Sequence, residues 1–89
     1  MKLEGEVSIK RVKQVYGDLK DELKGSNEVI IDMSGVVSID ASIAQVLLSA
    51  TIKAKELGKE LRLENIPAAL NKTLALAGLV ANTVQGGHE

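Results

Sequence analysis

The sequence contains no cysteine and almost no aromatic residues: Tyr16 stands alone, and both phenylalanine and tryptophan are absent. Without cysteine, neither a disulfide framework nor a thiolate metal site can form. A surface that stacks the bases of single-stranded nucleic acid needs aromatic side chains, so that kind of binding is not expected. The formal net charge of −1 also gives no bulk attraction to nucleic acid or to anionic lipid.

Long apolar runs are missing as well. The first residues lack the apolar segment of a signal peptide, and no run approaches the roughly 18 to 20 apolar residues of a membrane helix. We therefore expect a cytoplasmic protein with no direct membrane insertion. The 89 residues predict one domain over residues 1–85, followed by a disordered tail at residues 86–89.

No constellation of catalytic residues stands out. The only histidine, His88, lies in the predicted tail, which argues against a catalytic triad. Neither phosphate-loop motif, GxxxxGK[ST] or GxGxxG, is present. Asp32 and Asp40 resemble part of a magnesium site, but no third carboxylate supports them. We expect no enzyme activity, no cofactor and no metal.

Apolar periodicity predicts alternating strands and helices. Strands are expected at residues 2–7, 28–33 and 59–66, and helices at residues 9–23, 41–57 and 67–77. Residues 34–38 are predicted to form a turn, and residues 80–84 a short strand or helix. The alternation predicts an α/β sandwich with a mostly parallel or mixed sheet of about four strands flanked by helices. The start of the second helix then lies at the C-terminal edge of the sheet, where such folds usually place their sites.

The first two helices carry apolar stripes. In the first helix the predicted core residues are Ile9, Val12, Val15, Tyr16, Leu19 and Leu23. In the second helix they are Ile43, Val46, Leu47, Ala50, Ala54 and Leu57. Three further apolar residues, Ala44, Leu48 and Ile52, lie on roughly the opposite side of the second helix. They either pack against neighbouring helices, Leu48 best of all, or form an exposed patch for a partner protein.

Ser42 opens the second helix and allows two interpretations. The run Ser42-Ile43-Ala44-Gln45 matches the S-x-x-Q capping box, in which both side chains satisfy backbone donors. Alternatively, Asp40 is the cap and the Ser42 hydroxyl lies free in the first turn. In both cases the hydroxyl lies near the positive end of the helix dipole, which favours an added phosphate, although Asp40 would repel it.

The stretch VIIDMSGVVSIDAS, residues 29–42, resembles the STAS domain, named for sulfate transporters and anti-sigma factor antagonists. The family shows a buried strand ending in Asp or Asn plus Leu, a turn, an apolar pair and a variant of Asp-Ser-Ser-Gly. Asp32-Met33 matches the strand end, and residues 39–43 match the signature, with Ala41 in place of the first Ser and Ile43 in place of Gly. LEGEV at residues 3–7 and the run from Ala44 to Leu79 extend the resemblance over nearly the whole chain.

The resemblance implies a binding and switching module. Family members of the anti-sigma antagonist type bind a serine kinase with a histidine-kinase-like ATPase fold, which phosphorylates a serine at the start of the second helix. By position, Ser42 matches that phosphoacceptor and Asp40 matches the family's aspartate. The partner-binding candidates are Asp40, Ala41, Ile43, Gln45, Leu48 and Ile52.

Two alternatives remain open. In the first, the chain is a non-phosphorylated STAS subunit of a chemotaxis-type signalling or lipid-transport complex, and Ser42 only caps the helix. In the second, the sheet edge binds a small ligand or nucleotide. In the first alternative the partner is a subunit of that complex rather than a kinase. A homodimer is compatible with either alternative.

Overall fold

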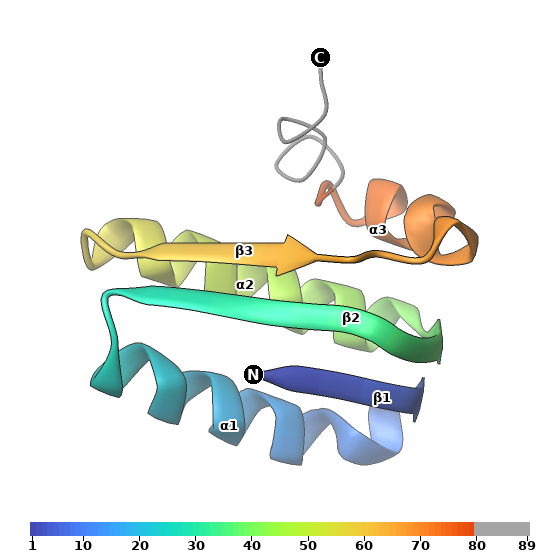
Figure 1. Ribbon diagram of the computed structural model, residues 1–89, viewed down its shortest axis with the longest axis horizontal. Coiled ribbons are helices and arrows are strands. Elements are labelled where there is room, and N and C mark those ends of the chain that lie inside the picture. Colours follow the sequence, from blue (N-terminus) through green and yellow to red (C-terminus); the bar gives the residue numbers. More distant parts are fainter. Residues whose placement is uncertain (80–89) are drawn as a thin grey trace.

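A computed structural model describes residues 1–79 as a three-stranded sheet with two long helices against it (Figure 1). The strands are β1 (Lys2–Val7), β2 (Glu28–Ile39) and β3 (Glu60–Glu64). The helices are η1 (Ile9–Arg11), α1 (Val12–Gly25), α2 (Ala41–Glu56), η2 (Ala68–Leu70) and α3 (Asn71–Leu76), where η1 and η2 are single 3₁₀ turns. No helix within residues 1–79 is long and apolar enough to cross a membrane.

The three strands lie in the order β1-β2-β3 and are all parallel. This confirms the predicted α/β fold, with three strands in the described part of the chain against the four or so expected. Crossover connections between parallel strands are right-handed in nearly all proteins. Because both crossovers step across the sheet in the same direction, they carry α1 and α2 to the same face.

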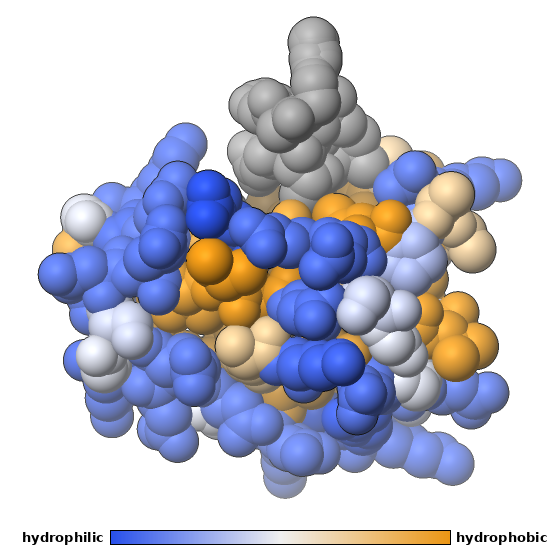
Figure 2. All heavy atoms as spheres, viewed as in Figure 1, coloured by the Kyte–Doolittle hydropathy of each residue, from blue (hydrophilic) through white to orange (hydrophobic). Residues whose placement is uncertain are grey.

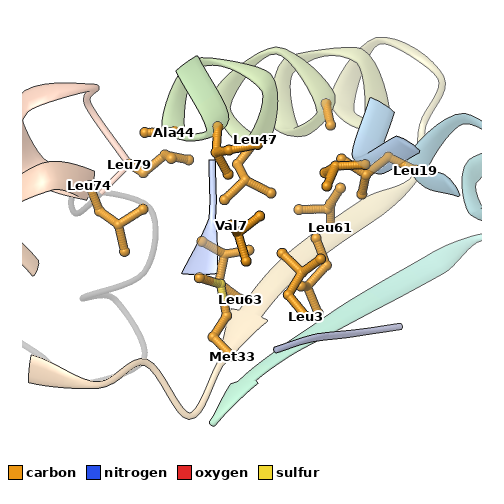
Figure 3. Close-up of a cluster of buried hydrophobic side chains, with 14 of the residues drawn as sticks. Leu3, Val7, Leu19, Met33, Ala44, Leu47, Leu61, Leu63, Leu74 and Leu79 are labelled. Atoms are coloured by element: carbon orange, nitrogen blue, oxygen red, sulfur yellow. The ribbon is translucent and has the colours of Figure 1, made fainter. Parts of the chain in front are cut away.

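The core lies between that face and the two helices (Figure 3). Alternate residues of each strand point into it, as the burial of Leu3 and Val7 on β1 and of Leu61 and Leu63 on β3 shows. The other members of the core come from β2, the helices and the end of the described chain: Val15, Leu19, Leu23, Val29, Ile31, Met33, Val36, Ile43, Ala44, Leu47, Ala50, Ala54, Leu70, Leu74 and Leu79. Leu19 and Leu47 therefore hold α1 and α2 over the same sheet face.

The prediction that residues 34–38 form a turn is wrong, because β2 continues through them to Ile39. Gly35, with Ser34 before it and Ser38 three residues after it, looks like part of a turn in the sequence, yet pairing with β1 keeps the segment extended. The register advances from Lys2↔Asp32 to Glu4↔Gly35 and then from Gly5↔Val36 to Glu6↔Ser38. The second strand thus holds an extra residue at two places, and such bulges bend a strand without ending it.

Three predicted core residues prove to be exposed. Ile9 belongs to η1 rather than to α1, and its side chain is 63% exposed. Tyr16 lies on the outer side of α1, where the Lys20 ammonium lies 5.4 Å from the centre of its ring. Leu57 follows the end of α2 and is half exposed. Each lies near the end or on the side of its helix. There the apolar stripe of the sequence extends beyond the part of the helix that packs against the sheet.

The remaining predictions concern the second half of the chain. The second helix ends as predicted, with Gly58 at a φ of +73° just beyond it. The third helix begins with the turn η2 after Pro67, and α3 is shorter than expected. The predicted element at residues 80–84, the domain end at residue 85 and the tail at residues 86–89 lie outside the described residues.

Candidate functional site

The candidate site lies where β2 ends and α2 begins, at the C-terminal edge of the sheet. Ile39 is the last residue of the strand and Asp40 is the N-cap of the helix, with an extended backbone (φ −106°, ψ 177°). The Asp40 carboxylate accepts a 3.1 Å hydrogen bond from the backbone N–H of Ile43. Asp40, rather than Ser42, therefore caps α2, and the capping-box interpretation of Ser42 is wrong.

Both oxygens of Asp40 are engaged. Oδ1 accepts the Ser42 hydroxyl at 2.6 Å in addition to the Ile43 amide. Oδ2 accepts the backbone N–H of Ile9 at 2.8 Å, from the turn that follows β1. One carboxylate thus joins the start of α2 to the connection between β1 and α1.

These donors lower the pKa of Asp40 below the ordinary value for an aspartate. The hydrogen bond from the Ser42 hydroxyl is the largest cause, and the backbone N–H groups of Ile43 and Ile9 act in the same direction. Each donor stabilises the charged carboxylate more than the protonated acid. Asp40 is therefore negatively charged at neutral pH, and Ser42 directs its hydroxyl hydrogen toward that charge.

Ser42 lies in the first turn of α2 and is half-buried. The expectation that its hydroxyl would be free if Asp40 were the cap is wrong, because the hydroxyl donates to Asp40. Ala41 and Gln45, which lie beside Ser42 on the helix, are exposed. The surface that surrounds the serine therefore includes two of the predicted partner-binding residues.

Sequence reasoning missed two apolar side chains at this end of the molecule. Ile9, whose amide binds Asp40, is 63% exposed, and Val37 near the end of β2 is 68% exposed. Ile9 fits a helical stripe and Val37 fits a turn, so neither stands out in the sequence. Val37 has no register partner on β1, because the bulge between Gly5↔Val36 and Glu6↔Ser38 passes over it. This missing partner is the one feature that distinguishes Val37 from its neighbours, and it belongs to the strand pairing rather than to the sequence.

The structure does not bring all the predicted partner-binding residues together. Ile43 has no exposed surface and is a core residue, so its assignment to the partner surface is wrong. Leu48 is partly buried against the core, whereas Ile52 is 51% exposed. Ten residues of helix, about 15 Å, separate Ile52 from Ser42, so Ile52 belongs to another part of the surface. The site at the start of α2 therefore retains Asp40, Ala41, Ser42 and Gln45.

Asp32 has a local structural role. Its Oδ1 accepts hydrogen bonds from the backbone N–H of Ser34 at 2.9 Å and from the side-chain amide of Asn65 at 3.2 Å. These donors, the Ser34 amide first, lower the pKa of Asp32. Asp32 lies within β2 and Asp40 directly follows its end, eight residues further along, so the two are separated by roughly 25 Å of extended chain. No group of three metal-binding side chains occurs within residues 1–79, so nothing there supports the magnesium site.

The chain belongs to the STAS domain family, because the family model described as "Mlab, STAS domain" matches residues 1–84. Its fold is similar to a solved structure of the anti-sigma factor antagonist SpoIIAA in its unphosphorylated form. That match has a TM-score of 0.75 and 18% sequence identity, and it covers 88% of this chain and 70% of the SpoIIAA chain. At this identity the likeness shows the shared fold. No curated protein matches the sequence.

Proposed function

We propose that this chain is a cytoplasmic regulatory module that binds a partner protein through the start of α2 and is switched by phosphorylation of Ser42. The hydrogen bond between the Ser42 hydroxyl and Asp40 carries the proposal. A phosphate on Ser42 has no hydrogen to donate to Asp40 at neutral pH and brings further negative charge to the carboxylate. The modification therefore changes both the charge and the geometry of the surface that a partner would contact.

The surroundings of Ser42 support this role. Ile43 directs its side chain into the core, so the branched residue that replaces the family's glycine does not itself cover the half-buried serine. The exposed side chains of Ala41 and Gln45 flank the hydroxyl on the helix, and Ile9 is joined to Asp40 through its amide. Exposed apolar side chains such as Ile9 supply area for protein contact. The likeness of the fold to an anti-sigma factor antagonist points to a serine kinase of the histidine-kinase-like type as the partner.

The test is the intact mass of the chain after incubation with ATP and an extract of the cells that make it. We expect a species with one added phosphate, which Ser42→Ala removes and the matched change Ser38→Ala retains. Ser42→Asp should abolish capture of the kinase while the circular dichroism spectrum stays unchanged. Phosphate that persists in Ser42→Ala, or a chain that acquires none, contradicts the proposal.

A second candidate function is that of a constitutive subunit of a signalling or lipid-transport complex. The same hydrogen bond favours it, because a hydroxyl that already orders the helix start has a structural role without modification. The two candidates differ in the mass experiment, since a constitutive subunit acquires no phosphate. They also differ in binding, because a complex that tolerates Ser42→Asp uses another surface of the chain.

A further inference from the structure

The face of the sheet opposite α1 and α2 is uncovered in the described part of the chain. Parallel sheets usually have helices on both faces. Here both crossovers lead to one face, and the side chains on the other face of β1 and β3 are exposed at alternate positions. Figure 2 looks onto this face and shows polar side chains around an apolar strip. We call it the open face, and it is defined by Lys2, Glu4, Glu6, Glu28, Ile30, Asp32, Glu60, Arg62 and Glu64.

The open face is acidic, although the whole chain is nearly neutral. It holds six carboxylates and two basic side chains, a formal charge of −4, against −1 for the full sequence. The rest of the chain is therefore net positive. Such a separation of charge creates a local potential that attracts cationic partners and repels anionic ones. Nucleic acid and anionic membrane surfaces are excluded as occupants by their charge.

Like charges face one another across the strands. Glu28 is the register partner of Glu60, and Asp32 is the register partner of Glu64. Pairs of like charge at such positions destabilise a sheet. Nη2 of Arg62 lies 3.5 Å from Oε2 of Glu28 and 3.5 Å from Oε2 of Glu64. Within residues 1–79 Glu60 makes no ion pair. The repulsion that remains between these carboxylates lowers the stability of the chain on its own. A cationic group from another molecule would relieve it.

The centre of the open face is apolar. Ile30 is half-buried and is the register partner of Arg62, with the acidic pairs on either side along the same two strands. We propose that the open face binds a basic segment of another protein, with lysine or arginine side chains against the carboxylates and an apolar side chain over Ile30. This surface lies on the opposite side of the sheet from α2, so the proposal does not rest on the function of Ser42.

The test uses a fluorescein-labelled octalysine peptide and fluorescence anisotropy at low ionic strength. We expect the double variant Glu6→Gln/Glu60→Gln to weaken binding about tenfold, because it neutralises two carboxylates that make no ion pair with any other residue of the described range 1–79. The matched control is Asp18→Asn/Glu22→Gln, which removes the same charge from exposed positions of α1. It should change binding less than about twofold. Circular dichroism checks that both variants fold.

The position of the peptide gives a second measurement. In a ¹⁵N-labelled sample, amide shifts should follow β1 and β3 and should disappear as salt screens the charges. Equal weakening by both double variants, shifts confined to α1 and α2, or no binding by the unaltered protein would each overturn the proposal. Concentration-dependent self-association that Glu6→Gln/Glu60→Gln abolishes would assign the open face to a second copy of this chain and overturn it as well.

Discussion

The hydroxyl of Ser42 lies 2.6 Å from Oδ1 of Asp40 and donates to it, so the serine and the helix cap form one hydrogen-bonded unit. Oδ2 of the same carboxylate accepts a hydrogen bond from the backbone N–H of Ile9. A chemical change at Ser42 therefore reaches, through Asp40, a turn that lies 31 residues before Asp40 in the sequence. The backbone N–H of Ile43 donates a third hydrogen bond to this carboxylate, so Asp40 connects Ser42, the start of α2 and the turn after β1.

The first prediction concerns the pKa of Asp40 in Ser42→Ala. The serine hydroxyl is the largest cause of the lowered pKa, so its removal should raise the pKa of Asp40 toward the ordinary aspartate value. Loss of one hydrogen bond should also reduce the free energy of unfolding by about 0.5 to 1.5 kcal/mol. NMR titration of the side-chain carboxyl carbon measures the pKa. The control Ser38→Ala should leave it unchanged, and an unaltered pKa in Ser42→Ala would contradict the assigned hydrogen bond.

The second prediction separates the two functions of Asp40. In Asp40→Asn one side-chain oxygen remains and still caps α2, because asparagine is as good an N-cap as aspartate. The amide nitrogen that replaces the other oxygen cannot accept the Ile9 N–H. Hydrogen exchange should therefore accelerate at Ile9 while the amide of Ile43 stays protected.

The control for this experiment is Asp40→Ala, which removes both acceptors. Exchange should then accelerate at Ile43 as well as at Ile9, and the thermal midpoint should fall below that of Asp40→Asn. If the two variants behave alike at both amides, the division of the carboxylate between α2 and the turn after β1 is wrong.

The third prediction concerns acid. The pKa values of Asp40 and Asp32 are lower in the folded chain than the ordinary aspartate value. The folded state thus holds these protons less tightly than the unfolded state, and stability rises with pH where the unfolded groups titrate. The contribution is complete above about pH 5, where the unfolded carboxylates are ionised, and is lost as the pH falls further through the lowered values. Urea unfolding at a series of pH values should show this loss.

Asp40→Asn supplies the comparison for the pH series. It removes one of the two titrating groups, so its stability should depend less steeply on pH below about 4 than that of the unaltered chain. A variant with the same pH dependence would show that Asp40 contributes nothing to acid sensitivity.

Much of the fold is predictable from the sequence, because apolar periodicity sets which side of a helix or strand is buried. The bounds of β1 and the start and end of α2 follow from this signal and from Gly58. The length of β2 does not, since its second half is held by pairing with β1 and locally resembles a turn. Long-range pairing of this kind has no counterpart in a local pattern.

The candidate site was partly predictable for the same reason. Asp40 and Ser42 are separated only by Ala41 in the sequence, so a local hydrogen bond between helix start and cap was foreseeable. The contact between Asp40 and the amide of Ile9 depends on where the turn after β1 lies in space. The burial of Ile43 likewise depends on the rotation of α2 against the sheet, which motif matching does not reveal.

The fourth prediction concerns the stability of the sheet. Glu60 faces Glu28 across the strands and makes no ion pair within residues 1–79. Glu60→Gln should therefore raise the free energy of unfolding by about 0.2 to 1 kcal/mol, because like charges at register positions repel. Urea unfolding at low salt measures the gain, and added salt should reduce it. Glu22→Gln on the exposed side of α1 is the control and should be nearly neutral. A loss of stability in Glu60→Gln would mean that its charge helps the sheet.

The last prediction uses two glycines with open space around them. Gly17 lies inside α1 and Gly58 follows α2, and a Cβ placed on either would meet no atom within 4 Å. They differ in the backbone: Gly58 has a φ of +73°, whereas Gly17 lies in the helix. Gly17→Ala should therefore stabilise the chain by about 1 kcal/mol through helix propensity.

Gly58→Ala should destabilise by about 1 to 2 kcal/mol, because an L side chain is strained at positive φ. Thermal unfolding of both variants under one condition measures the opposite signs. Since neither substitution creates a contact, the difference between them isolates the backbone conformation that ends α2. If both variants shift the midpoint in the same direction, the left-handed conformation of Gly58 does not hold in solution, and the connection from α2 to β3 takes another path.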